Sequence, residues 1–327
     1  MEARIGVPAR HGLGGPAELV LHASVARRYY IDNRSKVEIA DEFGVSRFKV
    51  ARMLETAREV GLVRIEIGLP GTIDLELSAV LRERLAIAHA VVIDTHETDS
   101  TSLRGDVGGA TARLLEEVVT DDDVLGLSWS RAVRDMTASL RHLAAAAVVQ
   151  LTGALPRADI EESAMELVRG VAQLGGGPAF LFYAPLLVSD ADTARALRNQ
   201  PEVARAVAQY GSVTKAVAGI GLWTAGRSTV FEACSERERR ALAKRNVVAE
   251  ISGILLDADG NAVETELTER TVGITAPQMR AIPEVIGIAY DEVKAPAVLA
   301  AVRGGLVKGL VTHSSLAQAI LNGPDGR

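Results

Sequence analysis

The chain has 327 residues, of which 48% are hydrophobic and 24% are charged, and its formal net charge at pH 7 is −6. This length allows large buried cores and indicates two domains, whereas the negative charge argues against indiscriminate nucleic-acid binding. Cys234 is the single cysteine, so no internal disulfide can form and a reducing cytoplasm is the expected compartment. We find no signal peptide and no bilayer-length apolar run, so no membrane partner is expected.

A glycine-rich run and a helix are expected first. Residues 1–16 include HGLGGP and are predicted to form a flexible arm. Residues 17–33 carry apolar side chains at helical spacing and are predicted to form a helix. Arg27 and Arg28 lie off its apolar face, where they either contact phosphates or are simply solvated.

The segment 36–55, KVEIADEFGVSRFKVARMLE, has the pattern of a helix-turn-helix. Ala40 is small enough for two helices to approach closely, and Gly44 tolerates the positive φ of a tight turn. Val50 and Met53 return at helical spacing and would pack the second helix onto the first. An ordinary solvated hairpin of helices is the alternative, because A-x-x-x-G spacing also arises by chance.

The second helix is predicted to begin at Ser46, a residue type preferred at the N-cap. Its outward positions carry Arg47, Lys49 and Arg52. Hydroxyl and basic groups near the N-terminus of such a helix suit the major groove of DNA. We therefore expect these four residues to contact double-stranded operator DNA.

Residues 62–67, LVRIEI, alternate apolar and charged side chains and predict a short strand, which would complete a winged helix-turn-helix over 17–68. Residues 1–68 hold 11 Lys+Arg against 9 Asp+Glu, a charge of +2, and the remainder carries −8. A single copy of this weakly charged N-terminal domain, here called the head, would bind DNA poorly, since phosphate contacts supply much of the affinity. We therefore expect paired heads in a homo-oligomer, a dimer or tetramer.

Strands and helices alternate through residues 69–327. The expected strands are 90–94, 124–128, 146–152, 179–185, 216–222, 247–256, 271–275, 285–290 and 306–311, with a hairpin turn at DADGN, 257–261. Strands that are apolar throughout and separated by helices imply a mainly parallel sheet covered on both faces. The predicted fold class is a doubly wound α/β domain behind the winged head.

In such sheets, ligands bind beyond the carboxyl ends of the strands and near helix N-termini. Residues 126–131, GLSWSR, pass from a strand into a helix, so Gly126, Ser128, Trp129 and Ser130 are candidates to cradle a phosphate or sugar hydroxyls. The alternative is that the two serines merely cap the helix.

Glu250 lies in the apolar run VVAEISG, where an acid is costly unless it is paired or faces a cleft. Lys294 follows the strand VIGIAY and precedes a helix; alone it would be a solvated loop lysine, but beside Glu250 it would help to hold hydroxyls and a phosphate. Gln150 ends another strand and is a candidate of the same kind. The six histidines lack metal-ligand spacing, and no nucleophile, Walker or dinucleotide motif occurs, so no metal, cofactor or catalytic residue is predicted.

Four segments resemble the SorC-type transcriptional regulators. VSRFKVARMLETAREVGLVRIEI resembles the recognition helix and wing, and GLSWSRAV the first turn of the effector domain. VVAEISGILLDADGNAV resembles the strand and hairpin with the ligand-contacting acid, here Glu250. The run from VGITAPQ to LAQAIL resembles the C-terminal part, with Lys294 at the effector lysine.

The resemblance implies an effector domain similar to sugar-phosphate isomerases and CoA transferases, converted to sensing. Such bacterial regulators bind phosphorylated sugars or related metabolites, typically as tetramers, and control carbohydrate-use operons. Ser130, Ala132 and the pair Tyr290-Asp291 depart from the usual glycine, threonine and glycine pair. A polyhydroxylated effector follows from the resemblance, whereas a phosphorylated one depends on how these departures reshape the pocket.

Two other classes of protein remain as alternatives. An enzyme that kept isomerase chemistry would use Glu250 as base and Lys294 as anchor, but no motif supplies a second acid/base partner. A pure scaffold would respond to no sugar at all.

Overall fold

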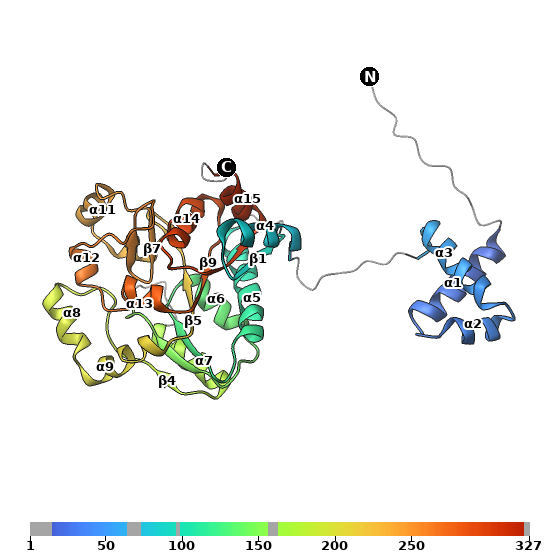
Figure 1. Cartoon of the computed structure of the whole chain (residues 1–327), viewed down its shortest axis with the longest axis horizontal. Coiled ribbons are helices and arrows are strands. Elements are labelled where there is room, and N and C mark those ends of the chain that lie inside the picture. Colours follow the sequence, from blue (N-terminus) through green and yellow to red (C-terminus); the bar gives the residue numbers. More distant parts are fainter. Residues whose placement is uncertain (1–14, 64–72, 96–98, 156–162, 324–327) are drawn as a thin grey trace, which may run out of the picture. The chain divides into compact units, whose positions relative to one another are not determined.

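The computed structural model describes residues 15–63, 73–95, 99–155 and 163–323. The chain divides into two compact units, residues 1–69 and 70–327 (Figure 1). The expected arm at 1–16, apart from its last two residues, and the expected wing strand beyond residue 63 lie outside the described residues.

The N-terminal unit consists of helices α1 (Pro16–Tyr30), α2 (Lys36–Phe43) and α3 (Arg47–Glu59). The side chain of Ser35 and that of Glu38 form a capping box that starts α2, and Gly44 ends it with φ 63, as the turn requires. One hydrophobic cluster joins the three helices: Val25, Ala26, Ile39, Ala40, Val50, Met53, Leu54 and Ala57. The predicted helix-turn-helix packing is therefore confirmed.

The larger unit is built on a parallel sheet of seven strands in the order β1-β10-β9-β5-β2-β3-β4. Its strands are β1 (His89–Ile93), β2 (Val124–Leu127), β3 (Ala147–Gln150), β4 (Ala179–Phe180), β5 (Lys215–Gly219), β9 (Glu284–Ile288) and β10 (Gly309–His313). The expected parallel sheet is confirmed. The chain runs outward from β2 through β3 to β4 and then returns to β5 on the other side of β2, so β2 and β5 flank a topological switch point.

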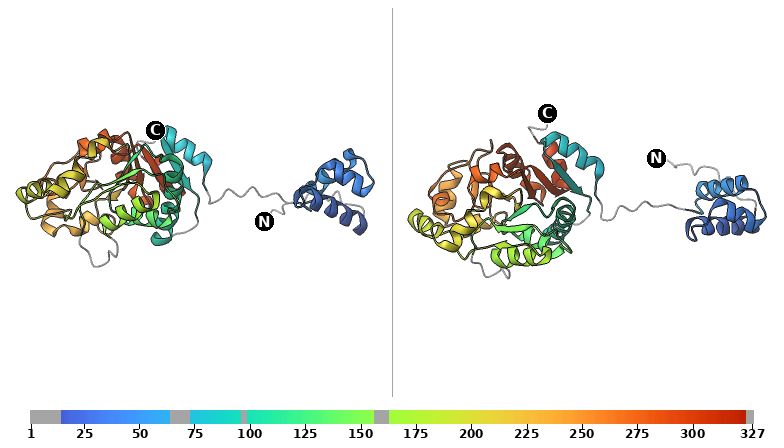
Figure 2. Two further views of the ribbon diagram at one scale, coloured as in Figure 1. Left: turned by 90° about the horizontal axis from the view of Figure 1, so that it is seen from below. Right: turned by 60° about the horizontal axis from the view of Figure 1, so that its bottom comes forward.

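Helices cover both faces of this sheet (Figure 2). One face packs against α5 (Ser100–Val118), α6 (Arg131–Ser139) and α7 (Ala164–Gly175), and the other against α4 (Leu75–Leu85), α13 (Ala276–Ala281), α14 (Ala295–Arg303) and α15 (Ser314–Leu321). In β3, Val148 points to the face covered by α5, α6 and α7, and its neighbour Val149 points to the face covered by α4, α13, α14 and α15. Because both faces are buried, the strands are mainly apolar, and polar residues such as Gln150, Lys215 and Glu284 lie at strand ends.

A small antiparallel sheet, β6 (Gly221–Leu222), β7 (Ala249–Ile251) and β8 (Ile254–Leu256), stands beside the main one. The remaining elements are α8 (Ala191–Arg198), α9 (Pro201–Val207), η1 (Tyr210–Ser212), α10 (Thr229–Ala233), α11 (Glu236–Ala243), α12 (Glu266–Glu269) and η2 (Glu292–Lys294). The chain leaves the main sheet at Ile220, so the predicted strand 216–222 is two strands in two sheets.

Three further strand predictions are wrong in extent. The predicted strand 247–256 is a hairpin whose turn, Ser252-Gly253, has φ values of 54 and 84, as a two-residue hairpin turn demands. Residues 271–275 make only isolated bridges at Thr271 and Gly273, and the strand predicted over 179–185 ends at Phe180.

Candidate functional site

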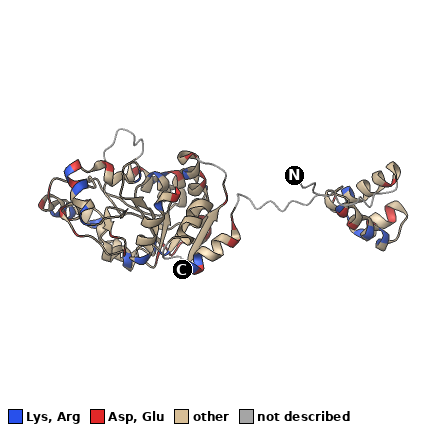
Figure 3. Cartoon of the chain, turned by 90° about the horizontal axis from the view of Figure 1, so that it is seen from above, with Lys and Arg blue, Asp and Glu red and all other residues tan. Residues whose placement is uncertain are grey.

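The exposed side of α3 carries the residues predicted to contact DNA. Ser46 is the N-cap, and its hydroxyl accepts a hydrogen bond from the backbone N–H of Lys49 at 3.2 Å. Arg47, Lys49 and Arg52 are exposed, whereas Val50 is buried. Figure 3 colours the Lys and Arg positions of the chain blue. The structure thus gathers all four predicted residues at one end of one helix.

Arg28 has a structural role within the N-terminal unit. Its guanidinium pairs with Asp32 and with Glu42, both at 2.9 Å, and so ties α1 to α2. The sequence also gave no reason to select Phe48, whose side chain is 67% exposed although it lies in the first turn of α3.

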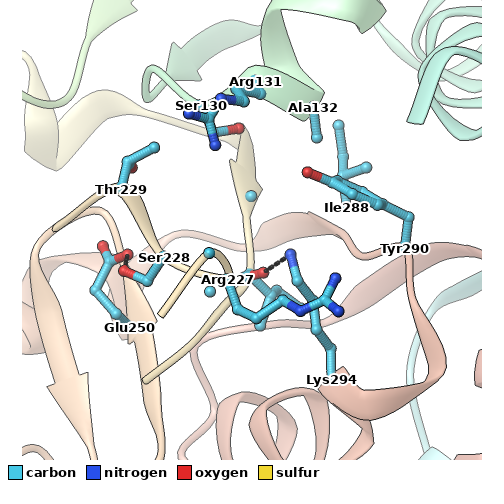
Figure 4. A pocket seen from close by; sticks show the side chains of 14 residues that line it. Ser130, Arg131, Ala132, Arg227, Ser228, Thr229, Glu250, Ile288, Tyr290 and Lys294 are labelled. Atoms are coloured by element: carbon cyan, nitrogen blue, oxygen red, sulfur yellow. Dashed lines mark hydrogen bonds between the residues drawn. The ribbon is translucent and has the colours of Figure 1, made fainter. Parts of the chain in front are cut away.

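A cavity opens at the carboxyl ends of β2, β5 and β9 (Figure 4). It brings together three residues predicted from separate segments: Ser130 after β2, Glu250 on β7 and Lys294 before α14. Its other principal side chains are Arg131, Arg227, Ser228, Thr229, Ile288 and Tyr290. The site therefore lies at the switch point of the sheet, where α/β folds place ligands.

Glu250 is buried, with 6% of its surface exposed. Its Oε1 accepts a hydrogen bond from the Gly253 N–H at 2.7 Å, and its Oε2 accepts one from the Ser228 hydroxyl at 3.0 Å. Burial nevertheless raises the pKa of this carboxyl, because the charged form loses solvation. Each oxygen keeps further acceptor capacity, which a ligand hydroxyl can use.

Lys294 is equally buried, and its Nζ donates to the backbone oxygen of Ile220 at 3.0 Å. The ammonium also lies 4.4 Å from the centre of the Tyr290 ring. Burial, followed by repulsion from Arg227, lowers the Lys294 pKa to about 8, and Glu250 offsets this only in part. Arg131 and Arg104 act in the same direction as Arg227, although Arg104 is paired with Asp135 and does not line the cavity.

The structure explains the departure at Tyr290-Asp291. Asp291 has φ 81, a conformation that favours glycine. Its carboxylate pairs with Arg227, and its backbone N–H donates to Nε2 of the buried His313 at 2.9 Å. These contacts hold an aspartate where a glycine would be relaxed, and they fix Arg227 at the cavity.

Two glycines of β5 and β6 mark the cavity wall. A Cβ on Gly219 would lie 2.4 Å from the Ser130 hydroxyl, and one on Gly221 would lie 3.0 Å from Oε2 of Glu250. The Gly219-x-Gly221 spacing, which is not a dinucleotide motif, therefore reflects close packing of the site residues. Arg227 was missed because nothing in its loop sequence distinguishes it.

A second cavity adjoins the first, and both are lined by Ser130, Gly219, Thr229 and Glu250. The second cavity adds the predicted Ser128 and Trp129, together with Ser252 of the hairpin turn. The Ser252 hydroxyl donates to that of Ser128 at 2.9 Å, joining the hairpin to the end of β2.

Two predicted residues line neither of these two cavities. A Cβ on Gly126 would lie 2.9 Å from Leu151, so this glycine permits close packing inside the sheet. Gln150 donates to the Thr152 carbonyl and accepts from the Phe182 N–H, and it borders a separate cavity. Its polar atoms are thus used inside the protein.

Taken together, a helix-turn-helix unit and an α/β unit with a polar, cationic cavity define a ligand-responsive transcriptional regulator. Within the described ranges, no helix is both long and apolar enough to span a membrane, and no group of three or more His, Cys, Asp or Glu side chains is placed to hold a metal ion.

Comparison with known proteins agrees with this class. Residues 71–322 match the family model of a sugar-binding domain. The chain is 29% identical to the transcriptional regulator LsrR of Klebsiella pneumoniae over 98% of both chains. It is 25% identical to the deoxyribonucleoside regulator of Bacillus subtilis over 92% of this chain and 97% of that one. The crystal structure of the full-length sorbitol operon regulator SorC from Klebsiella pneumoniae matches with a TM-score of 0.69 and 25% identity, covering 94% of this chain and all of that one. The chain belongs to this sugar-binding-domain family and is a SorC-type transcriptional regulator.

Proposed function

We propose that this regulator binds operator DNA through Ser46, Arg47, Lys49 and Arg52, and that an anionic, polyhydroxylated metabolite controls the binding. The effector is a sugar phosphate or a sugar acid. One observation carries the effector class: Glu250 and Lys294, both buried, line the same cavity at the switch point of the sheet.

Charge supports an anionic group in the effector. Three cationic side chains, Arg131, Arg227 and Lys294, line the cavity against one carboxylate, Glu250. A phosphate or carboxylate beside Lys294 and Arg227 would neutralise this excess and would accept charge-assisted hydrogen bonds. The start of α6 at Ser130 adds the backbone N–H groups of a helix N-terminus.

Hydroxyl recognition is assigned to the opposite wall. Glu250 accepts hydroxyl hydrogens, and Ser128, Ser130 and Thr229 can both donate and accept. Because Glu250 lines both cavities, a sugar whose anionic end lies beside Lys294 would extend into the second cavity. The names of the relatives, regulators of sorbitol and deoxyribonucleoside use, are consistent with such an effector.

The operator contacts need more than one head. Since one weakly charged unit would bind poorly, we propose a homo-oligomer that presents paired α3 helices to two half-sites in the promoter of a carbohydrate-use operon. The effector would shift the population of DNA-competent oligomers.

Thermal-shift titration with sugar phosphates, sugar acids and the matching free sugars tests the effector class. We expect stabilisation by an anionic compound, none by its uncharged analogue, and loss of the response in Lys294→Met and Glu250→Gln. Lys215→Met, a lysine paired with Asp123 away from the cavity, is the matched control and should respond as wild type. A normal response in both site variants would place the pocket elsewhere.

Gel-shift titration with DNA from upstream of the protein's own gene tests the head. Arg47→Ala and Arg52→Ala should each weaken binding at moderate salt, whereas Arg195→Ala, on the exposed side of α8, should not. Unchanged binding by both head variants would contradict the assignment of α3.

We propose binding without turnover. An isomerase-like reaction remains the second candidate, because Glu250 and Lys294 both have perturbed pKa values, as groups at catalytic sites often have. Incubation with each stabilising compound, followed by product analysis, separates the two; conversion abolished by Glu250→Gln would establish the enzyme.

A further inference from the structure

Phe48 is the one aromatic residue of α3, the proposed DNA-binding helix. Its side chain is 67% exposed. It lies in the first turn of α3, between Arg47 and Lys49. The hydrophobic cluster of the unit is complete without it. The Phe48 ring is therefore not used in the core of the unit and is open to a partner outside it.

Helical spacing places Phe48 directly over the contact surface. The buried residues of α3, Val50, Met53 and Leu54 among them, define the side that packs against α1 and α2. Phe48 and Arg52 are four residues apart and share one line along the opposite side. Phe48 therefore projects from α3 in the direction that a major groove would occupy.

Arg47 is held against this ring. Its guanidinium carbon lies 4.9 Å from the centre of the Phe48 ring, a cation–π contact that restricts both side chains. Across the described part of the chain, the side chains of Lys49 and Arg52 make no ion pair, unlike Arg28 and Arg34, which pair with Glu42. The first turns of α3 thus present one apolar group among three cations available to a ligand.

Duplex DNA offers partners both for the three cations and for the apolar ring. Its phosphates and guanine acceptors attract the cations, and the C5-methyl group of thymine is the apolar group in the major groove. Farther along the same line, the exposed Glu55 and Glu59 would be repelled by phosphates. Contact with bases is therefore confined to the first turns of α3.

We infer that Phe48 is a specificity-determining residue that recognises the methyl group of one thymine in each half-site, with Arg47 reading the guanine of an adjacent base pair. This inference rests on the proposed DNA-binding function. Arg47 supplies the bidentate contact to guanine O6 and N7, and its contact with Phe48 keeps the two readers side by side.

Replacement of single thymines by deoxyuridine tests the inference, because it deletes only the methyl group. A footprint on DNA upstream of the protein's own gene defines the duplex, and each thymine of one half-site is replaced in turn. For wild type we expect about fourfold weaker binding at one position, the value of one buried methyl group. Phe48→Ala should weaken binding to the thymine duplex and show no further loss with deoxyuridine at that position.

Phe48→Leu keeps an apolar side chain and should retain the sensitivity to deoxyuridine. Tyr183→Ala removes another exposed aromatic, 72% open, from the larger unit and should bind both duplexes as wild type. Circular dichroism at 222 nm checks that each variant keeps its helices. Equal deoxyuridine sensitivity in wild type and Phe48→Ala, or no sensitive thymine, would overturn the inference while leaving the proposed function intact. Absence of any footprint would refute both.

Discussion

Replacing Lys294 by Met should leave the ligand-free protein as stable as wild type or more stable. The Lys294 pKa is lowered from 10.5 to about 8, so keeping this ammonium in the folded protein costs about 3 kcal/mol relative to the unfolded chain. Methionine removes the charge at similar volume but leaves the Ile220 oxygen without its donor, which costs about 1–3 kcal/mol. The difference predicts a free energy of unfolding at pH 7 between equal to wild type and about 2 kcal/mol higher.

The pH dependence of this difference is the sharper test. Between pH 8 and 10.5 the unfolded lysine binds more protons than the folded one, so wild type gains stability on the variant as pH rises, by about 1.4 kcal/mol per pH unit. Urea unfolding of both proteins at pH 7, 8, 9 and 10 measures it. Lys215→Met is the control, because Lys215 is paired with Asp123 at 2.8 Å and its loss should destabilise at pH 7. A strongly destabilised Lys294→Met with a pH-independent difference would refute the reasoning.

Four further variants probe Asp123, Glu250 and Asp291. Burial alone would raise the pKa of Asp123, but hydrogen bonds from Lys215 and Thr214 hold it well below its usual range. Asp123→Asn should therefore lower the free energy of unfolding at pH 7, measured in urea, by about 2 kcal/mol. This loss should shrink as pH falls below about 4. Burial raises the pKa of Glu250, so ionisation opposes folding as pH rises above about 4.5, and Glu250→Gln should gain stability on wild type over that rise; a constant difference would contradict this. Asp291→Gly and Asp291→Ala both lose the pair with Arg227, but only alanine keeps the cost of φ 81, so the glycine variant should unfold with about 1 kcal/mol more free energy; equal stability would mean that the backbone carries no strain.

The main sheet could be predicted from sequence because its strands are buried on both faces and so read as apolar runs bounded by polar residues. The short strands and bridges outside the main sheet could not be predicted in this way. The hairpin turn at Ser252-Gly253 was available as a Ser-Gly pair between apolar runs, but the stronger signal of Asp257–Asn261 hid it. Residues 271–275 look like a strand although only isolated bridges pair them, since their burial comes from loops rather than from a ladder.

For the candidate site, sequence position identified the residues at strand ends, because the carboxyl ends of parallel strands meet. Ser130 and Lys294 were predicted in this way, and Glu250 was predicted because an acid in an apolar run is costly; all three lie at one cavity. Arg227 could not be found, since it reaches the cavity from a loop whose course depends on tertiary contacts. Phe48 was not singled out either, because its exposure depends on how α3 packs against the other two helices.

The costs at the cavity and the expected function have one physical origin. The protein holds Lys294 with a lowered pKa and Glu250 with a raised one, and it keeps Asp291 at a positive φ, so the folded ligand-free unit contains groups that would each be more stable elsewhere. A site built only for stability would have paired or removed them, as the Asp123–Lys215 pair is arranged at the opposite end of β5. An anion beside Lys294 and hydroxyl groups that donate to Glu250 would relieve the costs of these two side chains. The relief would add to the binding energy only in the conformation that brings the two groups together. A ligand can shift a conformational equilibrium only if it binds one conformation more tightly than the other. The cost of burying Lys294 and Glu250 would give the effector this difference in affinity.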